Sequence, residues 1–356
     1  MKKILLVIDS LTSGGAQRQI VGLAKLLHEK GYNVKLIYYH NIEFYKPFLD
    51  GNGVKNELIE DSSNAIKRIF NIRKAIKDFK PDVIISYLDT PNIITCLLKF
   101  CGMRYKLIVS ERNTTQILNY KEKIKFLMMR WANIIVPNSY SQEKFIQNNF
   151  QKLANKVHTI TNFVDTDFFV PSNFAISDIC KIISVGRVSE QKNTLFFLQA
   201  LNCLKKEGLS FHVDWYGYSI PHYWRLCEEY IQENNLSDVI SFHKPSNNIV
   251  NKYQECDVFI LPSIYEGFPN VVCEAMCCGK PILCGDICDN SLIVKNGING
   301  YLFDPFSVDD MINKIRTFIT LSSERKKTMG IESRKLSLEK FSSDLFIKKY
   351  IDLIEN

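Results

Sequence analysis

Short apolar runs alternate with longer amphipathic stretches along the 356-residue chain. The apolar runs, bounded by turn-forming residues, predict buried strands at 4–8, 34–39, 54–59, 83–86, 107–110, 134–136, 157–161, 182–185, 211–215, 239–242, 258–261, 281–284 and 301–303. Apolar residues at helical spacing predict helices at 16–30, 64–79, 91–100, 121–131, 191–206, 223–233, 249–255, 308–321, 324–336 and 344–354. This alternation predicts the α/β class, with doubly wound parallel sheets covered by helices on both faces.

A polar, turn-rich stretch interrupts the rhythm near the middle of the chain. Residues 162–169 lead into Pro171-Ser172-Asn173, where we expect the linker between two domains. We predict an N-terminal Rossmann-like domain at 1–165, a C-terminal one at 172–338, and a last helix at about 340–356 that packs back on the first domain. Asp165 and Asp167 lie in this linker, where a turn is favoured over a metal site.

Composition narrows the class of protein. Apolar residues make up 46% and charged residues 23%, as in ordinary soluble proteins, and 45 basic against 38 acidic residues give a net charge of +7. This mild basic bias fits phosphate-bearing ligands or an anionic membrane surface, and no nucleic acid is expected. Eleven cysteines without paired metal-ligand spacing, and a start without a leader pattern, favour a reduced cytoplasm over a disulfide framework or a zinc site. No apolar run reaches the roughly 18 residues of a membrane-spanning helix, so any membrane contact is expected to be peripheral.

The stretch from Val258 to Gly285 carries the most specific pattern. A buried strand leads into a loop with Glu266, a short helix that we expect Asn270 to cap follows, and Glu274 is expected in its first turn. The carboxyl ends of parallel strands are where ligands bind, and helix N-termini favour anions. For Glu274 alone, a role as a mere partner of the helix dipole is an equally good interpretation.

Other charged or flexible residues also follow predicted strands. Arg187 and Lys192 follow the strand at 182–185 and offer a planar fork and a point charge for phosphate oxygens. Gly14 and Gly15 follow the first strand and would let the backbone approach a phosphate or sugar closely. They do not form a G-x-G-x-x-G fingerprint, and no acidic residue closes the second strand, which weakens a dinucleotide interpretation.

Five motifs recur in one known family. They are Gly14-Gly15-Ala16-x-Arg18, Ser110-Glu111-Arg112-Asn113, Gly186-Arg187-x4-Lys192-Asn193, Glu266-Gly267-Phe268-Pro269-Asn270-x3-Glu274-Ala275-Met276 and Asn296-Gly297-x2-Gly300. In these motifs the chain resembles family 4 of the retaining glycosyltransferases along essentially its whole length. The resemblance implies the GT-B architecture, with two Rossmann-like domains and an active site in the cleft between them.

The resemblance also implies roles for these residues. Glu274 would accept hydrogen bonds from the ribose of a nucleotide-sugar. Glu266 and the backbone of Gly267, Phe268, Pro269 and Asn270 would hold the donor sugar. Arg187 and Lys192 would neutralise the departing diphosphate without a metal or other cofactor. Gly14 and Gly15 would approach the diphosphate, and Arg18, Glu111, Arg112 and Asn113 would contact the acceptor or the donor sugar. The implied partners are a UDP-sugar and a surface glycan or lipid-linked acceptor. Peripheral contact with the inner membrane leaflet is a further partner that the resemblance implies for some members of the family.

The chain departs from the commoner family pattern in three places. No histidine lies near Glu111 or Arg112, Gly217-Tyr218-Ser219 stands where Gly-x-Gly is common, and Lys244-Pro245 replaces a frequent glycine. The predicted function is transfer of a hexose or N-acetylhexosamine, with a GDP-sugar enzyme as the alternative. A nicotinamide-dependent oxidoreductase, an epimerase and an inactive glycan-binding scaffold are weaker alternatives. Basic residues on the helices at 64–79 and 121–131 (Lys67, Arg68, Arg73, Lys74, Lys121, Lys123, Lys125 and Arg130) favour ordinary amphipathic packing over membrane contact.

Overall fold

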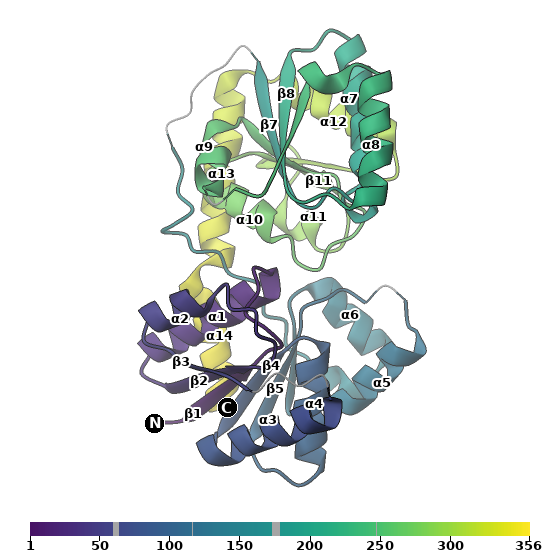
Figure 1. The fold of residues 1–356 in the computed structure, drawn as a ribbon. Coiled ribbons are helices and arrows are strands. Elements are labelled where there is room, and N and C mark those ends of the chain that lie inside the picture. The colour runs from purple at the N-terminus through teal and green to yellow at the C-terminus, as the bar shows by residue number, and fades with distance from the viewer. Residues whose placement is uncertain (60–63, 116, 173–178, 247) are drawn as a thin grey trace. The chain divides into compact units, whose positions relative to one another are not determined.

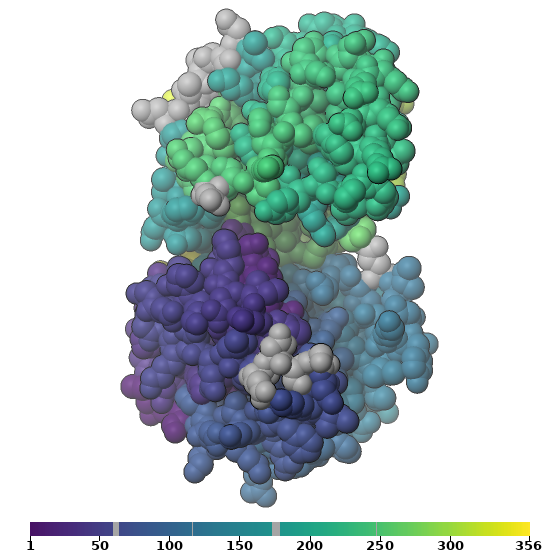
Figure 2. Space-filling model, in the orientation of Figure 1, coloured from purple at the N-terminus to yellow at the C-terminus, as the bar shows by residue number. Residues whose placement is uncertain are grey.

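The computed structural model describes residues 1–59, 64–115, 117–172, 179–246 and 248–356, so Asn173 of the expected linker lies outside the described residues. Contacts divide the chain into two compact units, each shown as a ribbon in Figure 1 and as a surface in Figure 2. The N-terminal unit comprises Met1–Phe163 and Ser343–Asn356, and the C-terminal unit comprises Val164–Ser342. Each unit contains one six-stranded sheet whose strand pairs are all parallel, so the predicted fold class is confirmed.

The sheet of the N-terminal unit has the order β3-β2-β1-β4-β5-β6. Its strands are β1 (Lys3–Val7), β2 (Asn33–Tyr38), β3 (Lys55–Leu58), β4 (Val83–Tyr87), β5 (Lys106–Glu111) and β6 (Ile134–Pro137). Ile4 of β1 lies opposite Val34 on one side and Val83 on the other. The strand order therefore reverses between β1 and β4, and the connections leaving their carboxyl ends diverge to opposite faces.

Helices cover both faces of this sheet because each turns one apolar face inward. One apolar cluster joins the sheet to α1 (Gly15–Glu29), α2 (Lys46–Gly51) and α14 (Ser343–Glu355). The other joins it to α3 (Ala65–Phe79), α4 (Asp89–Phe100), α5 (Tyr120–Met129) and α6 (Tyr140–Asn149). The last helix of the chain thus belongs to the core of the first unit.

The sheet of the C-terminal unit has the order β12-β11-β10-β7-β8-β9. Its strands are β7 (Cys180–Val185), β8 (Phe211–Tyr216), β9 (Ile240–His243), β10 (Val258–Leu261), β11 (Ile282–Gly285) and β12 (Gly300–Phe303). One face is covered by α7 (Thr194–Lys206), α8 (Pro221–Glu233) and α12 (Val308–Ile319). The other is covered by α9 (Ile249–Glu255), α10 (Asn270–Cys277), α11 (Asn290–Ile293) and the C-terminal part of α13 (Ser323–Phe341). Here the strand order reverses between β7 and β10.

The prediction of a strand at 157–161 is wrong. Val157 forms only a single bridge with Ile135, although the backbone N–H groups of His158 and Ile160 still donate to Ile135 and Pro137 at 2.9 and 3.1 Å. A continued parallel ladder would need the N–H of residue 137 to donate back, and proline has none. The sheet therefore stops at β6.

Three other local predictions need correction. The sequence patterns did not predict α2, α6 or α11, which the structure contains. The helix expected from Gln191 begins instead at Thr194, after a short 3-10 turn (Glu190–Lys192), because Asn193 adopts a left-handed conformation with φ 55°. Asn270 is the first helical residue of α10 rather than its cap, and Glu274 consequently lies beyond the first turn.

Candidate active site

The candidate site of the C-terminal unit is built where the strand order reverses. Arg187 follows β7, and the loop containing Glu266 follows β10. Because these two strands are parallel neighbours, their carboxyl ends lie side by side at the same edge of the sheet. Two motifs that are 74 residues apart along the chain are therefore close in space.

Lys192 and Glu266 form an ion pair at this edge. Lys192 Nζ lies 2.5 Å from Glu266 Oε1, and their side chains are only 13% and 10% exposed. Two further bonds connect the segments that carry them: Gln191 Nε2 donates to the Tyr265 carbonyl at 3.2 Å, and the Ile264 N–H donates to the Gln191 carbonyl at 3.0 Å. The structure thus brings together two residues that the sequence assigned to one site.

Arg187 is the exposed cation beside this pair. Across the described part of the chain its guanidinium forms no hydrogen bond or ion pair with another residue, so its donors are available to a ligand. The backbone before it is fixed by Trp215, whose Nε1 donates to the Gly186 carbonyl at 2.8 Å. A Cβ on Gly217 would lie 2.0 Å from that same carbonyl oxygen, so only glycine permits this approach of β7 and β8.

Glu274 lies in α10 with little contact to solvent. It is 3% exposed, and the Tyr253 hydroxyl donates to its Oε2 at 3.1 Å. The preceding Phe268 is buried and packs edge-on against Phe341 at 5.7 Å, which anchors the loop to the core. Gly267 and Asn270 remain partly exposed. The loop therefore has one anchored residue flanked by two positions that keep contact with solvent.

In the N-terminal unit, the first glycine loop leads into α1 without acidic residues in its first turn. Gly14 caps the helix in an extended conformation, and its carbonyl accepts from the Arg18 N–H at 3.0 Å. Gly15 is exposed, and Arg18 is partly exposed. The positive N-terminal end of α1 is consequently accessible to an anion, because Gly14 and Gly15 have no side chains to cover its backbone N–H groups.

Glu111 and Arg112 end β5 as buried groups. Glu111 is 0% exposed and lies 2.7 Å from Lys125 Nζ of α5, while its Oε1 has no hydrogen-bond partner among the described residues. Lys125 also pairs with Glu122 at 2.7 Å and with Asp89 at 3.4 Å. Burial raises the pKa of Glu111 to about 7, in spite of the opposing effect of Lys125. Burial alone would lower the pKa of Lys125, but its carboxylate neighbours outweigh burial and raise it. The raised pKa of Glu111 thus follows mainly from its burial, whereas the raised pKa of Lys125 follows from the carboxylates that share its ammonium group.

Arg112 is held by a stack and by polar contacts. Its guanidinium lies 4.4 Å from the centre of the Tyr87 ring and donates to Ser110 Oγ at 3.2 Å and to Asn162 Oδ1. The Tyr87 hydroxyl in turn lies 2.7 Å from that of Tyr350 in α14. Arg112 is 7% exposed and its Nε is without a partner in the described residues, which leaves one donor unused inside this cluster.

Asn113 is the first exposed residue after β5. Of the three residues assigned to sugar contacts here, it alone presents its side chain to solvent, whereas Glu111 and Arg112 point into the unit. The part played by Glu111 and Arg112 would therefore be exerted through their neighbours or through the donors and acceptors that their burial leaves unused.

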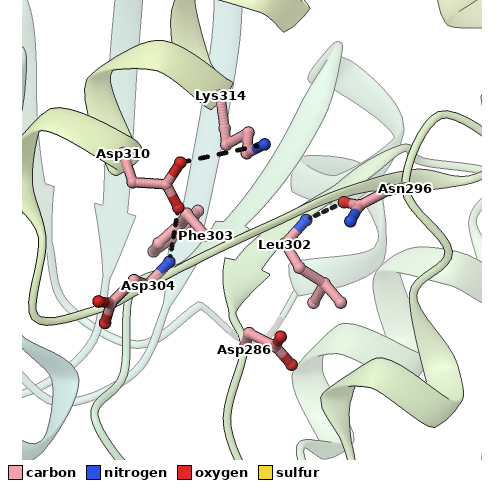
Figure 3. A pocket seen from close by; sticks show the side chains of 7 residues that line it. All are labelled: Asp286, Asn296, Leu302, Phe303, Asp304, Asp310 and Lys314. Atoms are coloured by element: carbon pink, nitrogen blue, oxygen red, sulfur yellow. Dashed lines mark hydrogen bonds and ion pairs between the residues drawn. The ribbon is translucent and has the colours of Figure 1, made fainter.

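A cavity of about 350 Å³ lies at the carboxyl ends of β11 and β12 (Figure 3). Its lining residues are Asp286, Asn296, Leu302, Phe303, Asp304, Asp310 and Lys314. It contains none of the residues that the sequence assigned to the site, and Lys314 is already 3.9 Å from Asp310. Three carboxylates with one paired lysine repel a diphosphate, so we do not place the donor here.

The sequence patterns did not reveal several residues that contact Glu274 in the C-terminal unit or Glu111 and Arg112 in the N-terminal unit. Lys125 looked like a surface position of an amphipathic helix, and Tyr253 had no motif. Asn138, whose Nδ2 donates to the Arg112 carbonyl at 3.3 Å, was overlooked although it directly follows β6, and its place after a strand is the signal that could have found it. Asn162 follows an apolar run that forms no strand. Leu88, with φ 76° after β4, gave no signal because glycine is the residue expected in such a conformation.

Two features are absent from the residues that the structure describes. Within them, no group of three or more His, Cys, Asp or Glu side chains could hold a metal ion. Likewise, none of the described helices is long and apolar enough to cross a membrane.

Comparisons with known proteins identify the family. Residues 13–168 match the model of Glycosyltransferase Family 4, and residues 168–336 match that of Glycosyl transferases group 1. Together the two matches extend over nearly the whole chain. They favour a transferase over the nicotinamide-dependent oxidoreductase that the Rossmann-like rhythm also suggested.

Curated relatives have related names. An N-acetylgalactosaminyltransferase of Campylobacter jejuni, named for an undecaprenyl-diphosphate-linked GalNAc-GalNAc-diNAcBac acceptor, is 29% identical over 78% of this chain and 77% of its own. An Escherichia coli UDP-Gal:GlcNAc-diphosphoundecaprenol α-1,3-galactosyltransferase is 24% identical over 70% of this chain and 69% of its own.

Solved structures share the fold. Anabaena HepE, in complex with UDP and glucose, superposes with a TM-score of 0.87 at 17% identity over all of both chains. A glycosyltransferase from Rickettsia africae has the same TM-score at 22% identity, over 99% of this chain and 98% of its own. The two parallel sheets described above are thus those of a GT-B fold, and the chain belongs to family 4 of the retaining glycosyltransferases.

Proposed function

We propose that this glycosyltransferase moves a hexose or N-acetylhexosamine from a UDP-sugar to a surface glycan or a lipid-linked oligosaccharide. The proposal rests chiefly on the Lys192–Glu266 ion pair beside the exposed Arg187, at the point where the strand order reverses. The names of relatives support the classes of donor and acceptor, because they include a UDP-galactose enzyme and several undecaprenyl-diphosphate acceptors.

The donor would be held by residues from three segments of the C-terminal unit. Glu274, whose Oε2 accepts from the Tyr253 hydroxyl at 3.1 Å, would accept hydrogen bonds from the ribose hydroxyls with its carboxylate. Glu266 and the backbone between Gly267 and Asn270 would hold the hydroxyls of the sugar. The anchoring of Phe268 in the core favours this arrangement, because a fixed loop loses little conformational entropy when it binds.

The leaving diphosphate would be stabilised by Arg187 and Lys192. As the bond from the anomeric carbon to the diphosphate oxygen breaks and the bond to the acceptor oxygen forms, negative charge grows on the departing phosphate. The acceptor proton would pass to that phosphate, and transfer on the same face would retain configuration. The guanidinium of Arg187 is exposed and has no partner among the described residues, so it can bind a phosphate, and Lys192 is already positioned by Glu266, so its charge needs little reorganisation at the moment of reaction.

The N-terminal unit would supply the acceptor contacts. Gly14 and Gly15 would admit an anionic group to the end of α1, with Arg18 nearby, and Asn113 would offer an exposed amide. Glu111 and Arg112, which are buried, would hold the carboxyl end of β5 in position. This reaction scheme requires no metal, and we place the enzyme in the cytoplasm, on the inner face of the membrane.

A donor screen tests the proposal. Purified enzyme is incubated with UDP-, GDP- and ADP-sugars, with and without lipid-linked acceptors, and release of the free nucleotide is followed in the presence and absence of EDTA. We expect release from a UDP-sugar and no effect of EDTA. Release from a GDP-sugar alone would support the alternative donor, and no release from any of them would refute the proposal.

Three variants test the assignment of residues. Arg187→Ala, Lys192→Ala and Glu274→Ala should each lower turnover by about 100-fold or more, because each removes charge stabilisation or positioning inside the site. Arg225→Ala and Lys206→Ala, which replace exposed residues of α8 and α7, are the matched controls and should leave turnover unchanged. Near-normal turnover in all three site variants would contradict the assignment.

A further inference from the structure

Leu88, the residue that follows β4, has a backbone conformation that is typical of glycine. Its φ is 76° and its ψ is 160°, which places it in a region that residues with a Cβ rarely occupy because they are strained there. Lys80, Asn193 and Asn235 also have positive φ, but their ψ values of 63°, 34° and 46° belong to the ordinary left-handed helical region. The backbone of Leu88 is therefore strained in a way that the backbone of these three residues is not.

The start of α4 does not account for this conformation. Leu88 is the N-cap of α4, and a leucine side chain has no group that could accept a hydrogen bond from the helix. The N-caps of α3, α5 and α6 have φ values of −81°, −87° and −144°, and each accepts a capping bond; they are Asn64, Asn119 and Ser139. Leu88 thus departs from two local rules at once, and such departures concentrate at functional sites.

The residues on either side of Leu88 hold it in this conformation. Tyr87 is fully buried, and the guanidinium of Arg112 lies 4.4 Å from the centre of its ring. On the other side, the N–H of Asn92 donates to the Leu88 carbonyl at 3.0 Å, and Asn92 Nδ2 donates to the Ser110 carbonyl at 2.9 Å. A strained residue persists only where its surroundings fix it, and here contacts with Ser110 and Arg112 fix both flanks.

Leu88 also lies where a ligand of this sheet is expected. β1 and β4 are parallel neighbours at the point where the strand order reverses (Figure 1), and open α/β sheets bind ligands at that point of the carboxyl edge. The connection that leaves β1 carries Gly14 and Gly15, and the one that leaves β4 begins with Leu88. Part of the Leu88 side chain packs against the apolar cluster on the α1 face, and the rest is open to solvent. The strained residue thus offers apolar surface at the edge where the acceptor is proposed to bind.

We propose that Leu88 binds the acceptor sugar through the apolar C–H face of the sugar ring. In this arrangement the exposed amide of Asn113, which follows the neighbouring strand β5, hydrogen-bonds to hydroxyls of the same sugar. An apolar wall combined with a few polar groups is typical of sites for small ligands. Because its neighbours fix Leu88, its side chain loses little conformational entropy on binding. The inference deepens the proposed function and rests on it, since that function places the acceptor at this edge.

Thermal unfolding tests the strain. Leu88→Gly and Leu88→Ala both remove the apolar side chain, but only alanine keeps a Cβ at positive φ, so Leu88→Gly should unfold about 2–4 °C above Leu88→Ala. Lys80 is the matched control, because it is exposed at the end of α3 with φ 52° and lies before β4, at the opposite edge of the sheet. Lys80→Gly should likewise unfold above Lys80→Ala. A Leu88→Gly variant that unfolds at or below the temperature of Leu88→Ala would remove the strain argument and overturn the inference.

Transfer assays test the contact with the acceptor. The probes are GlcNAc and GalNAc linked to undecaprenyl diphosphate, and release of UDP is measured with and without them. Leu88→Ala should raise the KM for the acceptor by about tenfold or more, because an apolar contact is lost, without changing the KM for the UDP-sugar or the release of UDP to water. Leu88→Met keeps the apolar surface and should stay within about twofold of the unaltered protein. Lys80→Ala should change none of these constants.

Methyl NMR gives a readout that does not depend on transfer. The Leu88 methyl signals, assigned by their loss in Leu88→Met, are followed while the methyl glycosides of GlcNAc, GalNAc, glucose and galactose are added in the presence of UDP. At least one glycoside should shift these signals. Leu226 of α8 is the matched control, because it is 50% exposed in the other unit and its signals should stay in place.

The outcomes separate this inference from the proposed function. An unchanged KM for the acceptor in Leu88→Ala, or Leu88 methyl signals that no glycoside shifts, would overturn the contact while release of UDP leaves the transferase assignment standing. If the unaltered protein releases no UDP from any UDP-sugar, the proposed function fails instead, because release of UDP to water does not involve Leu88.

Discussion

The buried carboxyl of Glu111 should make the stability of the N-terminal unit depend on pH near neutrality. Glu111, Glu122 and Asp89 surround Lys125, so the cluster has a charge of −2 when all four groups are ionised. Burial raises the pKa of Glu111 from 4.5 to about 7, and the nearby carboxylates add to the rise. The perturbation is Glu111→Gln, which keeps the shape of the side chain and removes its titration.

The sign follows from the proton balance. Between pH 4.5 and about 7 the folded state holds a proton on Glu111 that the unfolded state has lost, so the free energy of unfolding falls as pH rises through this window. A rise of 7 − 4.5 = 2.5 pKa units corresponds to about 3 kcal/mol. The unaltered protein should therefore lose about 3 kcal/mol relative to Glu111→Gln between the two ends of the window.

Urea unfolding at several pH values measures this difference in the free energy of unfolding. Hydrogen exchange of peptides from β5 and α5 then assigns the difference to the N-terminal unit. Glu57→Gln is the control, because Glu57 is 49% exposed in its ion pair with Lys35 and should show little pH-dependent difference. Lys125→Met should cost about 3–5 kcal/mol above neutral pH, and adding Glu111→Gln should recover part of it. A difference between unaltered protein and Glu111→Gln that stays constant, or grows with pH, would refute the reasoning.

Three further substitutions test close contacts elsewhere. Gly217→Ala would place a Cβ 2.0 Å from the Gly186 carbonyl oxygen, so it should destabilise the C-terminal unit by about 2 kcal/mol or more and weaken UDP binding, as measured by thermal unfolding with and without UDP. Gly22→Ala would place a Cβ 2.4 Å from the Phe163 ring and should cost about 1–3 kcal/mol in urea unfolding, with part of the loss recovered by Phe163→Leu; additive losses would argue against the clash. Asn64→Ala removes the cap that accepts from two backbone N–H groups of α3 and should cost about 1 kcal/mol, whereas an unchanged stability would show that the cap contributes nothing.

The sequence was sufficient for the rhythm of strands and helices because burial on both faces leaves continuous apolar runs. It failed where a single residue decides the geometry. Pro137 ends the ladder that the apolar residues after Val157 would otherwise continue, and the left-handed Asn193 delays the start of α7. Neither effect is visible in a pattern of apolar and polar positions.

The candidate site was predictable as a set of residues but not as a set of contacts. Glu266 and Lys192 were assigned to one site from motifs, yet their direct ion pair depends on β7 and β10 being neighbours, which only the sheet order reveals. Lys125 was misjudged because a lysine on an amphipathic helix is usually solvated. Its burial is explained by a carboxylate, Glu111, from a strand that the helical pattern does not include.

The hydroxyl contact between Tyr87 and Tyr350 has a consequence for the order of events during synthesis. The ribosome makes the first 163 residues of the N-terminal unit, then the 342 − 163 = 179 residues of the C-terminal unit, and only then the helix that carries Tyr350. At about 5–20 residues per second, the nascent first unit waits roughly 10–40 s without its final helix. During that interval the apolar surface that α14 will cover is open, and a chaperone that binds apolar segments would find it there.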